Sequence, residues 1–384
     1  MVAGRSTKPR ALVLVLVSTL ALFVVLGGSG GSYAAGDCTA AVGVEAPVTG
    51  GVAVLGDEQL VFAKLAVQDD NNTNGTHISL VQGDTELSPS LATTVTEHFI
   101  SNPQIVAVVG PAGSAEVTAV GSLFAAAGMG FISGSATRAT LTNGSNPTFF
   151  RVVASDGEQG PEDAGYIIHT LRPKAVMVID DSEPYSTVLA RSMIRQLRRA
   201  GIRVDHESVS QRQTDFARLV RKVAPPIGVV ILPWEIASNG QQFGEQLARA
   251  HRRAVIFGTD GLLSSAFTIV GSYVSSFGPD ITAIAADASL VAQARAAFPK
   301  FGTFGPPVYA ATHVVDEAIA SVCESGQTPT RANVLAQIRL TNEPTSVLGQ
   351  PIKFAPNGQL GGAHWFLFKI GRAHRYRMLP PGAL

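Results

Sequence analysis

The sequence predicts an α/β protein made of two three-layer α/β/α lobes, each with a parallel central sheet. The chain has 384 residues, 46% of them hydrophobic, which is enough for two buried cores. Residues 105–109 form an unbroken apolar run stopped by Gly110, as expected of a parallel strand covered on both faces. Strand and helix patterns then alternate in two successive runs, an arrangement typical of two similar lobes.

The first run of elements is predicted over residues 40–137. A short strand at 40–44 leads into a helix with apolar side chains at Leu60, Val61, Leu65 and Ala66. A helix is expected to begin near Ser88-Pro89 and end near Ser101, since proline is tolerated at a first helical position. The other elements expected are strands at 77–82 and 129–132 and a helix from Ser114, placed to cap it, to Gly128.

An Asn-rich segment, residues 69–76, resembles the front half of a calcium-binding loop. Its twelfth position is Val81, where such a loop requires a bidentate glutamate. The segment is therefore predicted to be an Asn-rich turn rather than a calcium site.

The second run of elements follows a flexible segment, residues 155–160, that is predicted to cross between the lobes. A strand at 149–154 leads into this segment. The run after it is expected to comprise helices at 161–171, 185–200, 215–223 and 239–250, and strands at 175–179, 202–208, 228–232 and 254–257. From about Ile281 a last strand and three helices, at 288–298, 308–325 and after Thr330, suggest a return to the first lobe. The chain is expected to end in strands.

Residues 1–35 have the features of a secretory signal peptide. Three cations precede an apolar run at 11–26, and small residues follow near Ala34. An uncleaved membrane anchor is the alternative, because the run is only slightly short of a span. Either way the folded part is expected outside the cytoplasm. Lipidation of Cys38 is not expected, because Asp37 stands where a lipobox needs a small residue.

Charge and motif content exclude several classes of function. Without the three leader cations the chain has 29 − 3 = 26 basic and 29 acidic residues, a balance of −3, so no nucleic-acid partner is implied. The eight histidines include no pair at metal-binding spacing, and neither a P-loop nor a Gly-x-Ser-x-Gly elbow occurs. No metal, cofactor or enzymatic activity is predicted, although a scattered Ser/His/Asp triad is not excluded by sequence.

The chain has two cysteines, Cys38 and Cys323. An oxidising compartment outside the cytoplasm favours a disulfide between them, and two separate thiols are the alternative.

Two loops of the first lobe are expected to leave the same sheet edge. They follow the strands 105–109 and 129–132 and carry Ser114 and the hydroxyl-rich residues 133–137. Ligands of open parallel sheets bind at the carboxyl ends of the strands, where helix N-termini offer free N–H groups. Hydroxyls and amides there suit a small anion such as a carboxylate.

Several motifs in this order resemble the type I periplasmic binding proteins of ABC transporters, specifically the branched-chain amino-acid (Leu/Ile/Val) family. They are PVTGGVAVLGDE at 47–58, VVGPAGS at 108–114, ISGSAT at 132–137, FFRVVASDGEQGP at 149–161, DDSEPYSTVLA at 180–190 and GTDG at 258–261. The resemblance covers about residues 46–368 and implies two lobes joined by a three-strand hinge. The expected limits are 37–155 plus 283–346 for lobe 1, and 156–282 plus 347–384 for lobe 2.

The resemblance also implies roles for residues of both lobes. Ser114 matches the family's carboxylate-binding serine, and Ser135 and Thr137 match positions that bind the same amino-acid head group. A plain helix cap and an ordinary hydroxyl-rich turn are the alternatives. In lobe 2, Tyr185 matches the family tyrosine and Asp260 the acidic residue that faces the ligand ammonium. A turn aspartate is the alternative for Asp260.

Other positions bear on the identity of the ligand. Trp234 is expected to cover the ligand or to cap the core, and Glu235 beside it is a further polar candidate. Leu55 stands where the family has an aromatic residue, and Pro307 lies near another such place, so a leucine preference does not follow. The sequence predicts a monomeric, exported receptor that binds a small amino acid and delivers it to a membrane permease. The alternatives are a partner-mediated sensor or a binder of amides, urea-like compounds or amine-free carboxylates.

Overall fold

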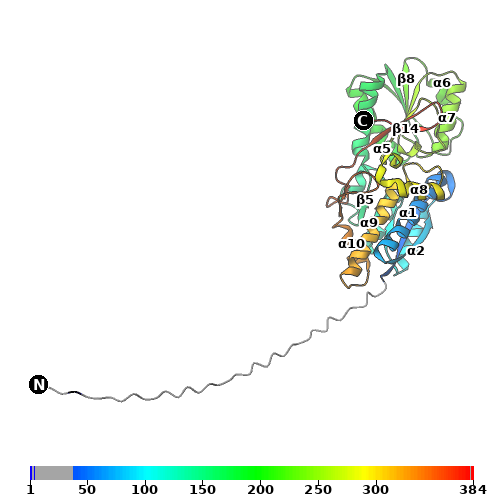
Figure 1. The fold of residues 1–384 in the computed structure, drawn as a ribbon. Coiled ribbons are helices and arrows are strands. Elements are labelled where there is room, and N and C mark those ends of the chain that lie inside the picture. Colours follow the sequence, from blue (N-terminus) through cyan, green and yellow to red (C-terminus); the bar gives the residue numbers. More distant parts are fainter. Residues whose placement is uncertain (2–3, 5–37, 381) are drawn as a thin grey trace. The chain divides into compact units, whose positions relative to one another are not determined.

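The computed structural model describes residues 1, 4, 38–380 and 382–384. The fold lies in the compact unit Ala35–Leu384. The predicted signal peptide, residues 1–35, lies outside the described residues except for Met1 and Gly4. Within the compact unit, β8, α6 and α7 belong to one lobe, and α1, α2, α9 and α10 belong to the other (Figure 1).

The first lobe is built on a five-stranded, fully parallel sheet. Its order is β2-β1-β3-β4-β5, and the all-buried β3 lies at its centre, as the unbroken apolar run predicts. The strands are β1 (Thr39–Ala46), β2 (His77–Asp84), β3 (Ile105–Val109), β4 (Gly130–Ser133) and β5 (Phe149–Arg151).

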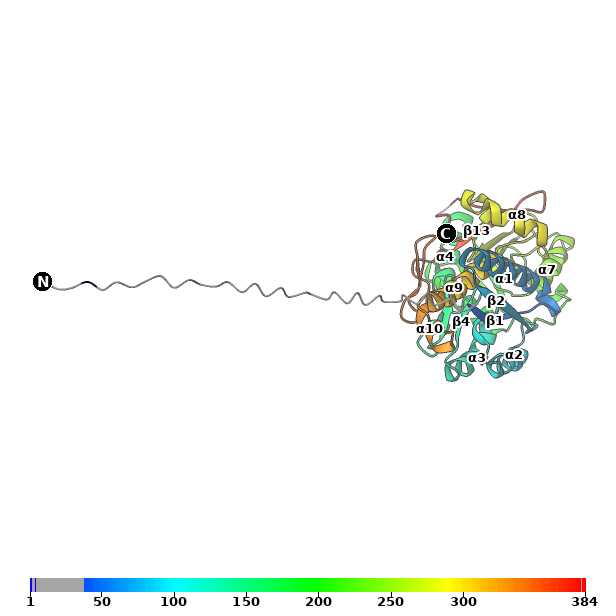
Figure 2. The same ribbon diagram turned by 60° about the horizontal axis from the view of Figure 1, so that its bottom comes forward.

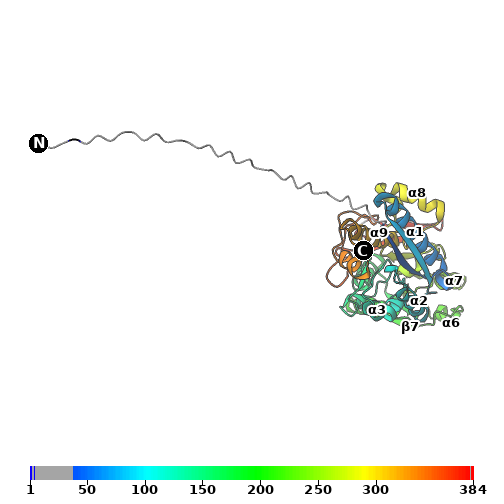
Figure 3. The same cartoon turned by 90° about the horizontal axis from the view of Figure 1, so that it is seen from below.

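Helices cover both faces of this sheet. One face packs against α1 (Ala53–Asn74), α9 (Gly305–Glu324) and α10 (Arg331–Ile338). The other packs against α2 (Pro89–Ser101) and α3 (Ser114–Ala126). Figures 2 and 3 show α1 and α9 on one side and α2 and α3 on the other. Apolar side chains of the strands are buried on both faces, so the three-layer prediction is confirmed.

The second lobe has a seven-stranded sheet of order β14-β13-β10-β9-β8-β6-β7. Its strands are β6 (Ala175–Asp180), β7 (Arg203–Ser208), β8 (Ile227–Leu232), β9 (Val255–Gly258), β10 (Tyr273–Ser276), β13 (Phe366–Ile370) and β14 (Tyr376–Met378). The first five are parallel, but β13 and β14 add an antiparallel edge that the prediction of a parallel sheet did not include.

Helices also cover both faces of the second sheet. One core contains apolar residues of α4 (Asp156–Tyr166) and α5 (Pro184–Arg199). The other contains residues of α6 (Ala217–Lys222) and α7 (Ala237–Arg249).

The chain crosses between the lobes three times, at residues 152–155, 277–280 and 361–365. An aromatic cluster joins these crossings: the ring of Phe277 lies 5.1 Å from that of Phe304 and 6.3 Å from that of Trp365. The indole N–H of Trp365 also donates to the carbonyl oxygen of Ser155 (3.2 Å). β5 and β10 end just before the first two crossings and β13 begins just after the third, so three segments of the chain next to these strands join the lobes.

The C-terminal part of the chain differs from the expected lobe limits. The predicted boundary lay at 346/347, but Leu348, Ile352 and Leu360 are buried in the core of the first lobe. The return to the second lobe therefore comes after residue 360. Near Ile281 the structure has a 3₁₀ turn, Ile281–Ala283, where a strand was predicted.

The Asn-rich segment is also different from the prediction, because α1 continues to Asn74 and ends at Gly75 in the left-handed conformation. The side-chain oxygen of Asn71 accepts hydrogen bonds from the Ile78 amide (2.9 Å) and the Thr76 hydroxyl (2.8 Å). The segment therefore forms the last turn of the helix and fixes the start of β2.

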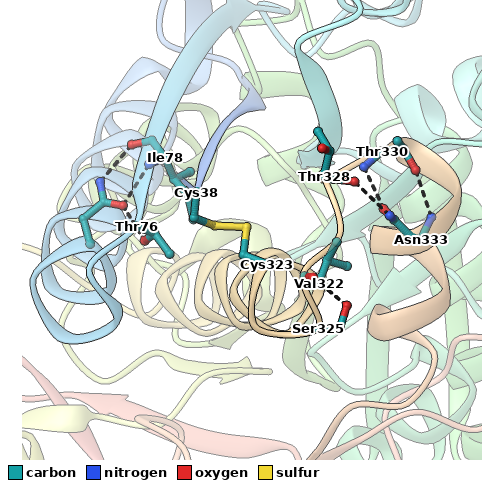
Figure 4. The surroundings of a disulfide bond; sticks show 10 residues. Cys38, Thr76, Ile78, Val322, Cys323, Ser325, Thr328, Thr330 and Asn333 are labelled. Carbon is teal, nitrogen blue, oxygen red and sulfur yellow. Dashed lines mark hydrogen bonds between the residues drawn. A yellow bond between two sulfur atoms is a disulfide. The ribbon is translucent and has the colours of Figure 1, made fainter. Parts of the chain in front are cut away.

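A disulfide joins Cys38, just before β1, to Cys323 near the end of α9 (Figure 4). The predicted pairing is present, with a Cα–Cα distance of 5.8 Å. The bond links the start of β1 to the end of α9, two parts of the first lobe that are 285 residues apart in sequence.

Candidate functional site

A cavity of about 460 Å³, its open mouth included, lies between residues of the two lobes. First-lobe residues supply most of its wall, and second-lobe residues supply the acidic part. Its lining residues are Pro47, Val52, Leu55, Gln59, Leu87, Ala112, Gly113, Ser114, Ser135, Thr137, Tyr185, Glu235, Asp260, Gly261 and Phe304. Most of the polar ones follow the carboxyl ends of β3, β4, β6, β8 and β9, the edge at which open sheets bind ligands.

The N-terminus of α3 reaches the cavity at Gly113 and Ser114. The N-cap is Gly113, not Ser114 as predicted, since the backbone of Gly113 is extended and the helix begins one residue later. The Gly113 amide donates to Glu116 Oε2 (2.6 Å). Ser114 is the first helical residue, and its hydroxyl oxygen accepts the Arg138 amide (3.2 Å). Free N–H groups and the positive end of the helix dipole at this point favour a negatively charged ligand group.

Ser135 and Thr137 line the cavity beside this helix end. The Ser135 hydroxyl donates to the Ala112 carbonyl (3.0 Å) and accepts from Gln59 Nε2 (2.9 Å). The Ser135 hydroxyl therefore fixes the loops that follow β3 and β4 relative to α1. Thr137 is 1% exposed, and its carbonyl accepts the Asp156 amide at the start of α4 (2.9 Å).

Tyr185 and Asp260 meet on the second-lobe side. Tyr185 OH donates to Asp260 Oδ1 (2.7 Å) and lies 2.6 Å from Thr259 Oγ1. Gln159 Nε2 donates to the same Asp260 oxygen (2.7 Å). No side chain of another described residue donates to Oδ2, so this oxygen is available to a ligand.

Burial changes the protonation of this acidic group. It raises the pKa of Asp260 to about 6, although the hydrogen bonds from Tyr185 and Gln159 favour the charged form. Burial and the charge of Asp260 likewise raise the pKa of Asp156 to about 7. Two buried carboxyl groups near each other would both be stabilised by a cationic ligand group.

Trp234 does not line this cavity, so its expected role as a cover for the ligand is wrong for this structure. Its ring is buried against Phe216 and Phe243, at centroid distances of 5.2 and 5.9 Å. Its indole N–H donates to the Ile179 carbonyl (2.6 Å). The alternative, that Trp234 caps the core, describes its position.

The residues beside Trp234 do reach the cavity. Glu235, the further polar candidate, lines it together with Gly261. A Cβ at Gly261 would lie 2.3 Å from the Trp234 carbonyl oxygen, so a side chain there would displace the turn that carries Asp260.

The apolar part of the wall comes mainly from the first lobe. Leu55 lies there, with Val52, Leu87 and Phe304. Phe304, rather than a residue at position 307, supplies an aromatic side chain. Sequence reasoning did not identify Phe304, Gln59 or Gln159. Gln159 lies in the segment predicted only as a crossing, and no local pattern marks a glutamine that contacts residues about 100 positions away.

Among the described residues, no lysine or arginine lines the cavity, whereas Asp260 and Glu235 do. Elsewhere, Asp70, His313 and Glu317 place ligand-type atoms within 4.8 Å of one another in the described part of the chain. His313 Nδ1 already lies 2.8 Å from Asp70 Oδ1, which makes this group an ion pair between α1 and α9. No helix in residues 38–384, position 381 aside, is long and apolar enough to span a membrane.

Several known proteins are similar to this one over most of its length. The "Leu/Ile/Val-binding protein homolog 3" of Brucella melitensis is 28% identical over 262 residues, which are 67% of this chain and 70% of that protein. The branched-chain amino-acid substrate-binding protein LivJ of Streptococcus pneumoniae, solved with isoleucine, has a TM-score of 0.79 at 21% identity and covers 89% of this chain and 100% of its own. A solute-binding protein of R. palustris, solved with benzoate, has a TM-score of 0.78 at 19% identity and covers 89% of this chain and 95% of its own.

A family model described as "Periplasmic binding protein" matches residues 39–374, which include both lobes and the cavity between them. The proteins of this family are solute-binding components of transport systems rather than enzymes. The chain therefore belongs to the type I periplasmic binding proteins of ABC transporters.

Proposed function

We propose that this protein is the exported receptor of an ABC importer that binds a small α-amino acid in the cavity between its lobes. The receptor then delivers the amino acid to a membrane permease. The observation that carries the proposal is the opposite polarity of the two walls. One wall offers hydroxyls and a helix N-terminus, and the other offers the buried carboxyl of Asp260.

This polarity suits the two charged groups of a zwitterion. The carboxylate of the ligand would lie at the N-terminus of α3, near Ser114, Ser135 and Thr137. Its ammonium group would lie at Asp260 Oδ2. A buried carboxylate needs a counter-charge, and no described basic residue in the cavity wall supplies one. The names of the related Leu/Ile/Val-binding proteins and the isoleucine complex of LivJ support an amino acid.

A carboxylate without an amine is the second candidate, because a protein of similar fold was solved with benzoate. Such a ligand would use the first-lobe wall in the same way. It would leave Asp260 without a cationic partner, so it would bind best when Asp260 is protonated.

Isothermal titration calorimetry with a panel of α-amino acids and benzoate distinguishes the two candidates. We expect at least one amino acid to bind, and Asp260→Ala to weaken it by about tenfold or more, since a buried ion pair loses one partner. Benzoate binding should change far less in that variant.

The matched control is Asp215→Asn, an exposed position in the second lobe where asparagine can cap the helix equally well. Binding of benzoate but of no α-amino acid would contradict the proposal, and equal losses for both ligands in Asp260→Ala would remove Asp260 from the ammonium site.

A further inference from the structure

Glu235 is a second acidic residue in the cavity wall, and binding of the amino-acid head group does not use it. It follows β8 and lies next to Gly261, whose Cβ would come within 2.8 Å of the Glu235 Cα. Glu235 and Asp260 are thus neighbours on the second-lobe wall, and each can meet a different part of one ligand.

The position of the Glu235 side chain is fixed by neighbouring polar groups. Gln211 Nε2 donates to Glu235 Oε2 (2.9 Å) and also to Asp181 Oδ2 (3.2 Å). The Glu235 amide donates to the same Asp181 oxygen (3.2 Å). No described residue donates a hydrogen bond to Glu235 Oε1. Glu235 is half-buried and lines the cavity, so this oxygen is open to a hydrogen-bond donor of a ligand.

The charges around Glu235 are acidic. Burial, followed by the charge of Asp181, raises the pKa of Glu235 well above its ordinary value, and Glu183 and Glu116 act in the same direction. Burial also raises the pKa of Asp181. A hydrogen-bond donor or a cation near Oε1 would therefore stabilise the charged form of Glu235.

We propose that the cavity selects an amino acid whose side chain ends in a hydrogen-bond donor, which Glu235 accepts while Asp260 binds the α-ammonium group. This inference rests on the proposed function. The apolar residues Val52, Leu55 and Leu87 would contact the methylene groups of such a side chain. A purely hydrocarbon side chain, as in leucine, would bury Glu235 without giving it a partner.

Two isosteric ligand pairs test this choice by titration calorimetry. Asparagine and leucine have side chains of nearly the same shape, and asparagine carries a neutral donor. Ornithine and norleucine differ by an ammonium group in place of a methyl group. In the unaltered protein we expect the donor-bearing member of at least one pair to bind at least about tenfold more tightly than its partner. The reason is that a site built to accept a hydrogen bond rejects an analogue that lacks the donor.

Variants of Glu235 show whether this residue makes the selection. Glu235→Met should abolish or reverse the preference within that pair. Glu235→Gln, which keeps an acceptor but not the charge, should abolish a preference for ornithine and retain part of a preference for asparagine. Glu245→Met, an exposed glutamate of the same lobe, is the matched control and should leave both ratios unchanged. Thermal unfolding establishes whether each variant folds. If a variant does not fold, the affinity ratios of the two ligand pairs in the unaltered protein still test the inference.

The possible failures are distinguishable. If leucine and norleucine bind at least as tightly as their polar partners, the inference is overturned and the proposed function stands. A donor preference that persists in Glu235→Met also overturns the inference, since another group would then accept the hydrogen bond of the ligand. If no α-amino acid binds, the proposed function fails and the inference fails with it.

Discussion

At the scale of single residues, the protonation of Asp260 couples ligand binding to pH. In the free protein burial raises the pKa of Asp260 to about 6, and an ammonium group binds only its charged form. Affinity for an amino acid should therefore be constant well above pH 6 and fall by up to about tenfold per pH unit below it.

Titration calorimetry between pH 4.5 and 8 measures this dependence. In Asp260→Asn the remaining affinity should vary much less over the same range, because asparagine does not titrate there. An unchanged profile in that variant would assign the pH dependence to another group, with Asp156, whose pKa burial raises to about 7, the first to examine.

The residues of the site were predictable to different degrees. Ser114, Ser135, Thr137, Tyr185 and Asp260 follow strands directly, so their place at the sheet edge follows from the strand pattern. Trp234 and Glu235 are adjacent and were harder to separate. The strand pattern places both at the end of β8, but only tertiary packing decides that the indole enters the core and the carboxyl faces the cavity.

At the scale of elements, an ion pair that was not predicted links α1 to α9. His313 of α9 lies 2.8 Å from Asp70 of α1 and 3.4 Å from Glu343. Burial opposes its charged form, but the hydrogen bond and charge of Asp70, with the charges of Glu343 and Glu317, raise the pKa of His313 to about 9.

This ion pair predicts a pH-dependent stability. The pKa of His313 is higher in the folded protein than its ordinary value of 6.5, so its contribution is complete below pH 6.5 and is lost as the pH rises through about 9. The melting temperature of the unaltered protein should therefore fall across this range by a few degrees more than that of His313→Gln.

Differential scanning calorimetry at pH 6 and pH 9.5 measures both proteins. His77→Gln, a change at an exposed histidine of the same lobe, serves as the control and should keep the full pH dependence. Parallel curves for the unaltered protein and His313→Gln would show that the ion pair contributes nothing to stability.

The elements that sequence predicted well are those with a strong apolar pattern, such as β3. The ones it missed depend on distant partners. The Asn-rich segment remains helical because Asn71 is held by the start of β2, and β13 is antiparallel because the chain returns from the first lobe after residue 360. Local composition carries no information on either contact.

At the scale of the whole molecule, the crossings connect the cavity to the hinge. Phe304 lines the cavity and packs on Phe277, which in turn packs on Trp365 beside the first crossing. Ligand contacts shared by both lobes favour the closed state, so binding should alter the surroundings of this cluster. Trp234 lies in the core of the second lobe, so we expect it to move with that lobe as one body.

The chain has only two tryptophans, so intrinsic fluorescence separates these two positions. A saturating amino-acid ligand should change the emission of the unaltered protein and of Trp234→Phe, whereas Trp365→Phe should respond little. The expected cause is a change in the contact of Trp365 with Phe277 and in its hydrogen bond to the Ser155 carbonyl when the crossings rotate. If Trp234→Phe instead abolished the response, the aromatic side chain at 234 would report on the ligand, and the cluster at the crossings would not be the part of the molecule that changes on closure.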